Sequence, residues 1–397
     1  MNLKIFTDNI EGEALNQVYT LAKLPAFADA KIRIMPDVHA GSGCVIGFTA
    51  DLGDKLIPNI VGVDIGCGML TIKLKNKLSD NEDENTAFFA SIDDAIHKFV
   101  PSGFDIHEHA VEHFRTNELI CIDKLKNTDT FNRSIGTLGG GNHFIEIDQD
   151  SEGYLYLIIH TGSRNLGKQV AEHYQRLAYR SLNESHRREK INEVIEKLKR
   201  EGKEKEIENT VKILNMQKTS VPRDLCWLEG EYRMNYLHDM KLCQEYAILN
   251  RKTIADIILK NTDLVEESRF ETIHNYIDHD SNIVRKGAIR ALEGERVLIP
   301  LNMRDGCIIG IGKGNEDWNC SAPHGAGRVL SRSKAKESIN LEDYMETMNG
   351  IYTTSVSQST IDESPFAYKP SEEIISLVED TVDIEKIIKP VYNYKAS

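Results

Sequence analysis

Several glycine turns in this sequence carry side chains that can bind a metal ion. The side chains are His39, Asp64, Cys67, His143 and His160. Two more metal-capable side chains follow at His274-Asn275 and at His324-Gly325. A glycine turn lets the backbone approach a ligand closely and leaves amide groups free for phosphate oxygens. Any one of these residues alone would more often be structural. The recurrence of one pattern indicates a shared site.

The spacing of Asp64 and Cys67 favours a site for two metal ions. Glycine stands on both sides of the cysteine, so a carboxylate and a thiolate three residues apart can converge on one point. A thiolate can bridge two cations, and two metals about 3.5 to 4 Å apart neutralise phosphate oxygens and align an attacking group. By ligand softness alone, cysteine and histidine favour zinc, with manganese second.

His324 differs from the other histidines because Gly325, Ala326, Gly327 and Arg328 follow it. Backbone amides in such a segment can cradle a phosphate, and the arginine adds positive charge. A histidine that lies beside a nucleotide phosphate, with metals near, can act as a nucleophile.

The composition narrows the class of protein. The chain has 397 residues and a formal net charge of -14, with 40% hydrophobic and 28% charged residues, which is an ordinary globular balance. We find no apolar run of the roughly 20 residues that a membrane helix needs, and no secretory signal at the N-terminus. Seven cysteines without a Cys-x-x-Cys pair argue against a disulfide framework. We therefore expect a cytoplasmic protein, in which any nucleic acid would bind a local basic cleft.

The elements that must position these side chains are short strands and amphipathic helices. Apolar runs predict strands at residues 32–34, 45–48, 69–74, 144–147 and 154–159, and again within 283–312. Periodicity predicts helices within residues 83–125, 168–218, 235–260 and 370–388, before a last strand at 391–394. We interpret residues 168–218 as a protruding helical hairpin broken at Gly202. Its mixed charges fit a solvated face or, alternatively, an RNA-contacting arm.

Taken together, these segments resemble the RtcB family of RNA-splicing ligases. The matching motifs are Pro36-Asp37-Val38-His39-Ala40-Gly41, Gly62-Val63-Asp64-Ile65-Gly66-Cys67-Gly68, Gly139-Gly140-Gly141-Asn142-His143, His160-Thr161-Gly162-Ser163-Arg164, His274-Asn275, Arg285-Lys286-Gly287-Ala288, His324-Gly325-Ala326-Gly327-Arg328 and Ala367-Tyr368-Lys369. They run in family order and cover nearly the whole chain.

The resemblance implies one α+β domain over residues 1–397, with mixed β-sheets around a central metal and nucleotide cleft. It implies two Mn²⁺ ions and GTP, and an enzyme that joins RNA ends bearing a 2′,3′-cyclic phosphate or 3′-phosphate to 5′-hydroxyl ends. A guanylylated histidine would form, GMP would pass to the RNA 3′-phosphate, and the 5′-hydroxyl would displace it. The setting would be RNA repair or tRNA splicing, with RNA as partner, a protein factor that activates turnover, no membrane, and a monomer as the default state.

Carried over residue by residue, the resemblance assigns Cys67 as the ligand shared by both metals. Asp64 and His274 would complete one metal site, and His143 and His160 the other. His324 would attack the α-phosphate of GTP, and Asp37 would orient it. Nucleotide contacts would come from Asn142, Glu146, Asn275, Gly325, Ala326, Gly327, Tyr368 and Lys395. RNA or phosphate contacts would come from Arg164, Lys286 and Arg328.

Two segments depart from the family pattern. Residues 302–306 replace a Gly-Ser-Met-Gly loop that lies near the guanine. Asp305 in this loop could accept hydrogen bonds from guanine, so we expect Asp305→Ala to weaken the preference for GTP over ATP. The ending Tyr394-Lys395-Ala396-Ser397 replaces a Lys-Gly ending. These departures suggest a divergent branch devoted to RNA repair.

Two other functions are compatible with parts of this pattern. A metal-dependent cyclic phosphodiesterase would act on RNA ends without ligation, and it would need the metal site but not His324. A non-ligating RNA-end binder would be expected to have lost its metal ligands, and all of them are present here.

Overall fold

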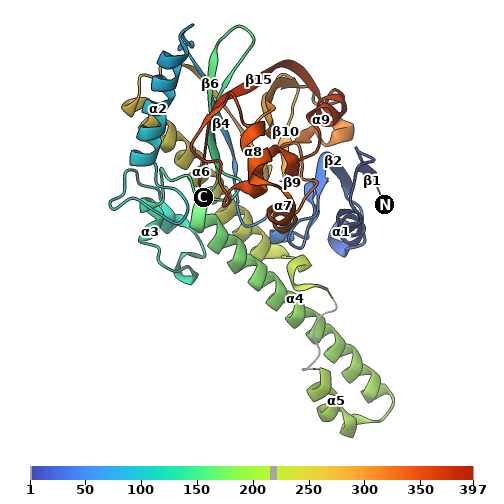
Figure 1. The fold of residues 1–397 in the computed structure, drawn as a ribbon. Helices are drawn as coiled ribbons and strands as arrows, with labels where there is room; N and C mark the ends of the chain where they lie inside the picture. The colour runs from blue at the N-terminus through green and yellow to red at the C-terminus, as the bar shows by residue number, and fades with distance from the viewer. Residues whose placement is uncertain (1, 215–220, 397) are drawn as a thin grey trace.

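Two β-sheets flanked by helices form the body of the molecule (Figure 1), and the computed structural model describes residues 2–214 and 221–396. The larger sheet has the strand order β11-β12-β15-β5-β6-β4-β7, with β14 paired to β15. Its strands are β4 (Gly68–Leu74), β5 (Phe144–Gln149), β6 (Leu155–Thr161), β7 (Glu266–Ile273), β11 (Arg296–Asn302), β12 (Gly306–Gly312), β14 (Tyr352–Thr353) and β15 (Val382–Lys395). The second sheet runs β1 (Asn2–Ile5), β2 (Lys31–His39), β3 (Ile46–Asp51), β9 (Ile283–Lys286) and β8 (Asn275–Ile277), and β10 (Ala288–Arg290) pairs with β13 (Ser321–Pro323).

The centre of the larger sheet is buried on both faces. Every residue of β6 is buried, as its continuous apolar run predicts. On one face, Leu70 and Ile72 of β4 pack with residues of α2 (Glu82–Phe99) and α6 (Gly230–Asn261). On the other face, Met69 packs with Leu298 and Ile309 from the far end of the same sheet. The sheet therefore curls, so that β4 approaches β11 and β12 across this face.

A helical hairpin projects from the body (Figure 1). α4 (Arg164–Arg200) runs outward from its first turns on the body, and α5 (Ile207–Leu214) packs against its far end after a turn at Gly202. The hairpin that the periodicity predicts is therefore present, although residues 215–218 of the predicted range lie outside the described residues. The other helices are α1 (Gly12–Ala22), α3 (Thr130–Arg133), α7 (Arg332–Ser338), α8 (Leu341–Thr347) and α9 (Ser371–Val378). Among the described residues, no helix combines the length and the apolar character needed to cross a membrane.

Two helix predictions were wrong over part of their range. α2 ends at Phe99, and residues 100–125 form turns and short 3-10 segments rather than helix. Pro101 and Gly103 follow α2 directly, and both residue types interrupt a helix. In the tail, α9 ends at Val378 and the chain then enters β15, a strand of 14 residues. Residues 382–385 alternate between apolar and acidic types, which is the period of a strand.

Candidate active site

Neighbouring strands of the larger sheet bring the five predicted metal ligands together. Asp64 and Cys67 precede β4, His143 precedes β5, His160 lies in β6, and His274 stands between β7 and β8. β4 pairs with both β6 and β7, and β6 pairs with β5, all antiparallel. The register places the relevant ends of these strands at the same edge of the sheet, so the five side chains converge.

The cluster is compact around the sulfur of Cys67. Its Sγ lies 3.3 Å from Nε2 of His160 and 3.7 Å from Nε2 of His143. Nε2 of His143 also lies 2.9 Å from Oδ2 of Asp64. The Cys67, His143, His160 and His274 side chains are almost fully buried. Burying several polar ligand atoms this close together is costly unless they have a partner. A bound cation would be such a partner.

Backbone carbonyls fix the orientation of two of the imidazoles. Nδ1 of His143 lies 2.9 Å from the carbonyl of Leu138, and Nδ1 of His160 lies 3.0 Å from the carbonyl of Asn142. A carbonyl accepts a hydrogen bond from Nδ1–H, so the Nε2 atom faces the cluster. This is the usual second hydrogen bond of a metal-binding histidine.

The ligand atoms divide into two groups that share Cys67. One group contains Cys67, His160 and His274, and the other contains Asp64, Cys67 and His143. This grouping differs from the sequence-based division, which put Asp64 with His274 and His143 with His160. His143 and Asp64 are in direct contact, and the register of β6 and β7 brings His160 to His274 instead, with ring centroids 5.2 Å apart.

The protonation states suit cation binding. Burial alone would raise the pKa of Asp64, but the hydrogen bond and charge of His143 lower it to about 2. Burial lowers the pKa of His160 and His274 well below the usual value, and neighbouring histidines add to the effect. Burial and the Asp64 carboxylate raise the pKa of the Cys67 thiol well above its usual value. The imidazoles of His160 and His274 are thus neutral, and the Cys67 thiol would lose its proton when a cation binds.

The residues present therefore fit a pair of divalent cations that share one thiolate. Nδ1 of His274 supports this fit, because it is buried and has no hydrogen-bond partner among the described residues. These residues could hold metal ions, and their chemistry leaves the element open, since a cysteine, a carboxylate and three imidazoles suit more than one ion.

His324 lies beside the cluster and is held by Asp37. Its Nδ1 is 2.6 Å from Oδ2 of Asp37, and its backbone N–H donates to the same oxygen at 3.1 Å. Asp37 is fully buried in β2, and the His324 ring centroid is 4.9 Å from that of His274. The close approach depends on Gly327, which has φ +76° and where an added Cβ would lie 2.3 Å from the carbonyl oxygen of Asp37.

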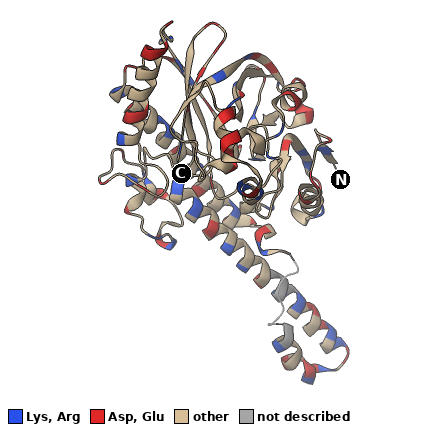
Figure 2. Ribbon diagram, viewed as in Figure 1, with Lys and Arg blue, Asp and Glu red and all other residues tan. Residues whose placement is uncertain are grey.

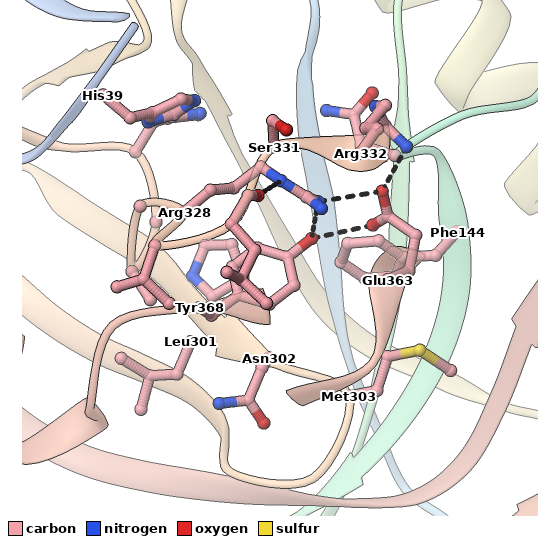
Figure 3. Close-up of a pocket in the computed structure, with 18 of the residues that line it drawn as sticks. His39, Phe144, Leu301, Asn302, Met303, Arg328, Ser331, Arg332, Glu363 and Tyr368 are labelled. Carbon is pink, nitrogen blue, oxygen red and sulfur yellow. Dashed lines mark hydrogen bonds and ion pairs between the residues drawn. The ribbon is translucent and has the colours of Figure 1, made fainter. Parts of the chain in front are cut away.

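A cavity of about 730 Å³ opens over His324 and the metal cluster (Figure 3). This is a normal size for a small-molecule site. Its walls include most of the residues that the sequence associates with a nucleotide. These are Asn142, Glu146, Gly325, Ala326, Gly327, Tyr368 and Lys395. His160, His324 and Arg328, which the sequence associates with RNA or phosphate, line the cavity as well. His39 also lines it, with Nδ1 3.0 Å from the Asp37 carbonyl, and belongs to neither ligand group.

Glu363 is a central residue of this cavity that the sequence analysis missed. Its carboxylate accepts hydrogen bonds from the Tyr368 hydroxyl at 2.7 Å and from Nζ of Lys395 at 2.6 Å. Arg328 and Arg332 pair with it as well (Figure 3). Burial opposes the charge, but Lys395 and the two arginines lower the pKa of Glu363 to about 2. A lone acidic residue two positions before a proline carries no sequence signal for this role.

Four predicted contacts lie away from the cavity walls. The Asp305 carboxylate accepts hydrogen bonds from Asn302, Arg304 and Ser371. Nζ of Lys286 is buried and donates to the carbonyl of Asn59. The Asn275 side chain joins the Asp64 carbonyl to the Gly287 amide. Arg164 donates to Thr137 and to the Gly103 carbonyl. The structure does not bring these four side chains to the cavity.

Fold and site together define a class of protein: an α+β fold with a buried cluster of side chains that could bind metal, a histidine held by a buried carboxylate, and a cavity of small-molecule size. The family can be named from the comparison with known proteins. A family model described as tRNA-splicing ligase RtcB matches residues 17–126 and 120–396. The chain belongs to the RtcB family.

Individual relatives agree with this assignment. The chain is 28% identical to the RNA-splicing ligase RtcB of Escherichia coli K12, over 96% of this chain and 94% of that protein. It is 24% identical to the tRNA-splicing ligase RtcB of Archaeoglobus fulgidus, over 93% of this chain and 88% of that protein. The tRNA-splicing ligase RtcB of Nanoarchaeum equitans is 25% identical, with 95% and 90% covered. The similarity is spread over nearly the full length of each chain.

Proposed function

We propose that this protein is a GTP- and Mn²⁺-dependent RNA ligase that joins 3′-phosphate or 2′,3′-cyclic phosphate ends to 5′-hydroxyl ends. Family membership supports RNA ligation as the overall activity. The names of the relatives support RNA as the substrate and RNA repair or splicing as the setting. The nucleotide, the ion and the chemistry of the ends are the parts that we add.

The observation that carries the proposal is the orientation of His324. Its Nδ1–H donates to a fully buried carboxylate at 2.6 Å, so the lone pair stays on Nε2. The ring lies on the wall of the cavity and next to the metal cluster. The phosphodiesterase alternative needs the metals but can dispense with His324 as a nucleophile. A histidine nucleophile needs both the neighbouring metals and a ring that is held in a fixed orientation.

The chain's residues would act as follows. Nε2 of His324 attacks the α-phosphorus of GTP, an N–P bond forms, and the bond to pyrophosphate breaks. Asp37 stabilises the positive charge that develops on the imidazole. An oxygen of the RNA 3′-phosphate then attacks the same phosphorus and frees His324. Finally the 5′-hydroxyl attacks the activated RNA phosphate, loses its proton and displaces GMP. A cyclic phosphate would first be opened by water.

The ligands of the metal cluster would be Asp64, Cys67, His143, His160 and His274. Two divalent cations bound there would neutralise phosphate oxygens and align the attacking groups. Ligand softness favours zinc, whereas the family resemblance favours Mn²⁺, and we follow the resemblance because availability and geometry can override affinity.

The test is incubation with α-labelled GTP and Mn²⁺, followed by denaturing electrophoresis. We expect label on the wild type and on His109→Ala, an exposed histidine that serves as control, and none on His324→Ala. A second assay offers RNA with 3′-phosphate and 5′-hydroxyl ends, against RNA with 3′-hydroxyl and 5′-phosphate ends. If the metal-loaded wild type takes no label yet opens cyclic phosphates, the phosphodiesterase function replaces the ligase.

A further inference from the structure

A second cluster of buried titratable side chains borders the nucleotide cavity. Glu146, Asp148 and Cys307 each offer a ligand atom within 4.8 Å of the others, and all three are at most 3% exposed. Glu146 and Asp148 stand two residues apart on β5 and so share a face of the sheet. Cys307 comes from β12, one strand beyond β15. Glu146 lines the cavity, whereas Asp148 and Cys307 lie behind it.

Asp148 is the unusual member of this cluster. Both of its carboxylate oxygens are buried, and neither accepts a hydrogen bond from any side chain or backbone group of the described residues. The carboxylate of Glu146 and the thiol of Cys307 lie within 4.8 Å of it, and Lys389 is the positive charge that acts on it. An ionised carboxylate is costly in such a place. A protonated one is not, because its O–H can donate to Glu146.

Glu146, in contrast, is surrounded by donors. Oε2 accepts a hydrogen bond from Nδ2 of Asn393 at 2.6 Å, and Oε1 lies 3.9 Å from Sγ of Cys307. The positive charge of Lys395 is also near. Burial raises the pKa of Glu146 to about 7, and burial with the Glu146 charge raises the pKa of Asp148 well above its usual value. Glu146 is therefore the member of the pair that ionises first.

We propose that Asp148 is a positioning residue for nucleobase selection: its protonated carboxyl donates to Glu146 and holds that side chain as an ionised acceptor on the cavity wall. The inference rests on the proposed use of GTP. Guanine presents two adjacent donors, N1–H and the 2-amino group, which an ionised carboxylate accepts. Adenine presents an acceptor at N1, which the same carboxylate repels. A site built to accept these hydrogen bonds discriminates strongly against a base that lacks the donors.

This arrangement takes over the role that the sequence suggested for Asp305. The oxygens of Asp305 are occupied by Asn302, Arg304 and Ser371, and Asp305 is not part of the cavity wall. Glu146 is part of that wall, and Asp148 sits directly behind it. A guanine acceptor can therefore be supplied by β5 although the loop at residues 302–306 departs from the family pattern.

The test measures the ratio of GTP to ATP affinity by calorimetry between pH 6 and pH 8, in a His324→Ala background that cannot turn over. The ratio cancels the titration of the phosphates, which both nucleotides share. We expect it to rise with pH through about 7, as Glu146 ionises. Asp148→Leu removes the donor and should lower the ratio at pH 7.5 by about tenfold, the scale of one hydrogen bond to a charged group.

Asp148→Asn keeps a donor toward Glu146, so the ratio should stay high and should still rise with pH as Glu146 ionises. Asp150→Asn is the matched control, because its carboxylate accepts from Tyr156 and Lys386 outside the cavity, and it should behave as the parent does. An unchanged ratio in a folded Asp148→Leu protein overturns the inference. If that variant does not fold, a tenfold fall of the ratio in folded Asp148→Asn, which keeps the donor, overturns it.

A third metal equivalent that is lost in Cys307→Ala would also overturn the inference, because the cluster would then be a metal site. Failure of the proposed function is a different result. In that case the wild-type protein would take no label from α-labelled GTP, whatever the selectivity of the Asp148 variants. Label on His324 together with unaltered Asp148 variants would remove the inference and leave the proposed function standing.

Discussion

At the scale of single residues, the pair formed by Asp37 and His324 is the part of the site most open to test. Both the Nδ1 and the backbone N–H of His324 donate to one oxygen of Asp37. We expect Asp37→Asn to slow guanylylation of His324 by roughly 10²- to 10⁴-fold, the range seen when the partner of a catalytic histidine is neutralised. The initial rate of labelling at saturating GTP measures this effect.

The control for this prediction is the metal content of the variant. Asp37 belongs to neither ligand group, so Asp37→Asn should bind as much Mn²⁺ as the wild type. A labelling rate within about threefold of the wild type, with full metal content, would show that His324 does not depend on Asp37.

Glu363 gives a prediction about stability and pH. Its pKa falls from the ordinary value of 4.5 to about 2 in the folded protein, so its contribution to stability is present above pH 4.5 and lost as the pH falls toward 2. A depression of this size corresponds to about 3 kcal/mol. We expect Glu363→Gln to lower the free energy of unfolding by about that amount at pH 7, leaving Lys395 buried without its partner.

Urea denaturation at several pH values tests the Glu363 prediction. The difference in unfolding free energy between Glu363→Gln and the wild type should be constant from pH 7 to about 5 and shrink below 4.5. A difference that stays constant down to pH 3 would mean that Lys395 and the two arginines do not lower the pKa of Glu363 in the folded protein.

Individual site residues were predictable from the sequence where a metal-capable or nucleophilic side chain stands beside a glycine. Asp64, Cys67, His143, His160 and His324 stand in or beside glycine turns. His274 has no glycine beside it, and the structure brings the five predicted metal ligands and His324 together. Glu363 and Asp148 were not predictable, because a buried acid differs from an exposed one only in its surroundings. Asp305 and Lys286 had suitable chemistry, but their side chains are occupied by neighbours that only the fold reveals.

At the scale of elements, the turn between β6 and α4 controls one half of the metal cluster. An added Cβ at Gly162 would lie 2.0 Å from Oδ1 of Asp64, although the backbone there is not in the left-handed region. We expect Gly162→Ala to push Asp64 out of place and to lower the metal content from two equivalents toward one. Elemental analysis of the purified protein measures this change.

Gly140→Ala is the matched control for Gly162→Ala. Gly140 also lies in a glycine turn beside the cluster, but its nearest neighbour would be 3.8 Å from an added Cβ, in ordinary contact. It should retain both metals. Equal metal content in the two variants would mean that the turn before α4 does not set the position of Asp64.

The sequence predicted an element well where its pattern of apolar residues fits only one type of secondary structure. The apolar run of β6 and the long periodic segments of α4 and α6 were all found at nearly the right bounds. Residues 100–125 were not, because polar turns held by tertiary contacts share their composition with an exposed helix. The tail was read as helix because its apolar residues also fit a helical face, whereas pairing of β15 with β5 and β12 decides for strand.

At the scale of the whole molecule, an acidic protein must bind an acidic substrate. The net charge is -14, so RNA affinity should come from a few local cations and should fall steeply with salt. The helical hairpin is not a basic surface, since its blue and red segments alternate along α4 and α5 (Figure 2). Arg328, by contrast, lies on the wall of the cavity.

We therefore expect the hairpin to be a solvated arm rather than an RNA contact. Replacing Lys197, Lys199 and Arg200 together by Glu should change the Kd for RNA by less than about twofold and leave its dependence on salt unaltered. Arg328→Ala should reduce the slope of log Kd against log salt by about 0.7 to 1, the value of one phosphate contact. Filter binding from 50 to 300 mM salt measures both. A large loss of affinity in the triple variant would instead assign the arm to RNA, because reversing three charges at the end of α4 leaves the distant cavity untouched.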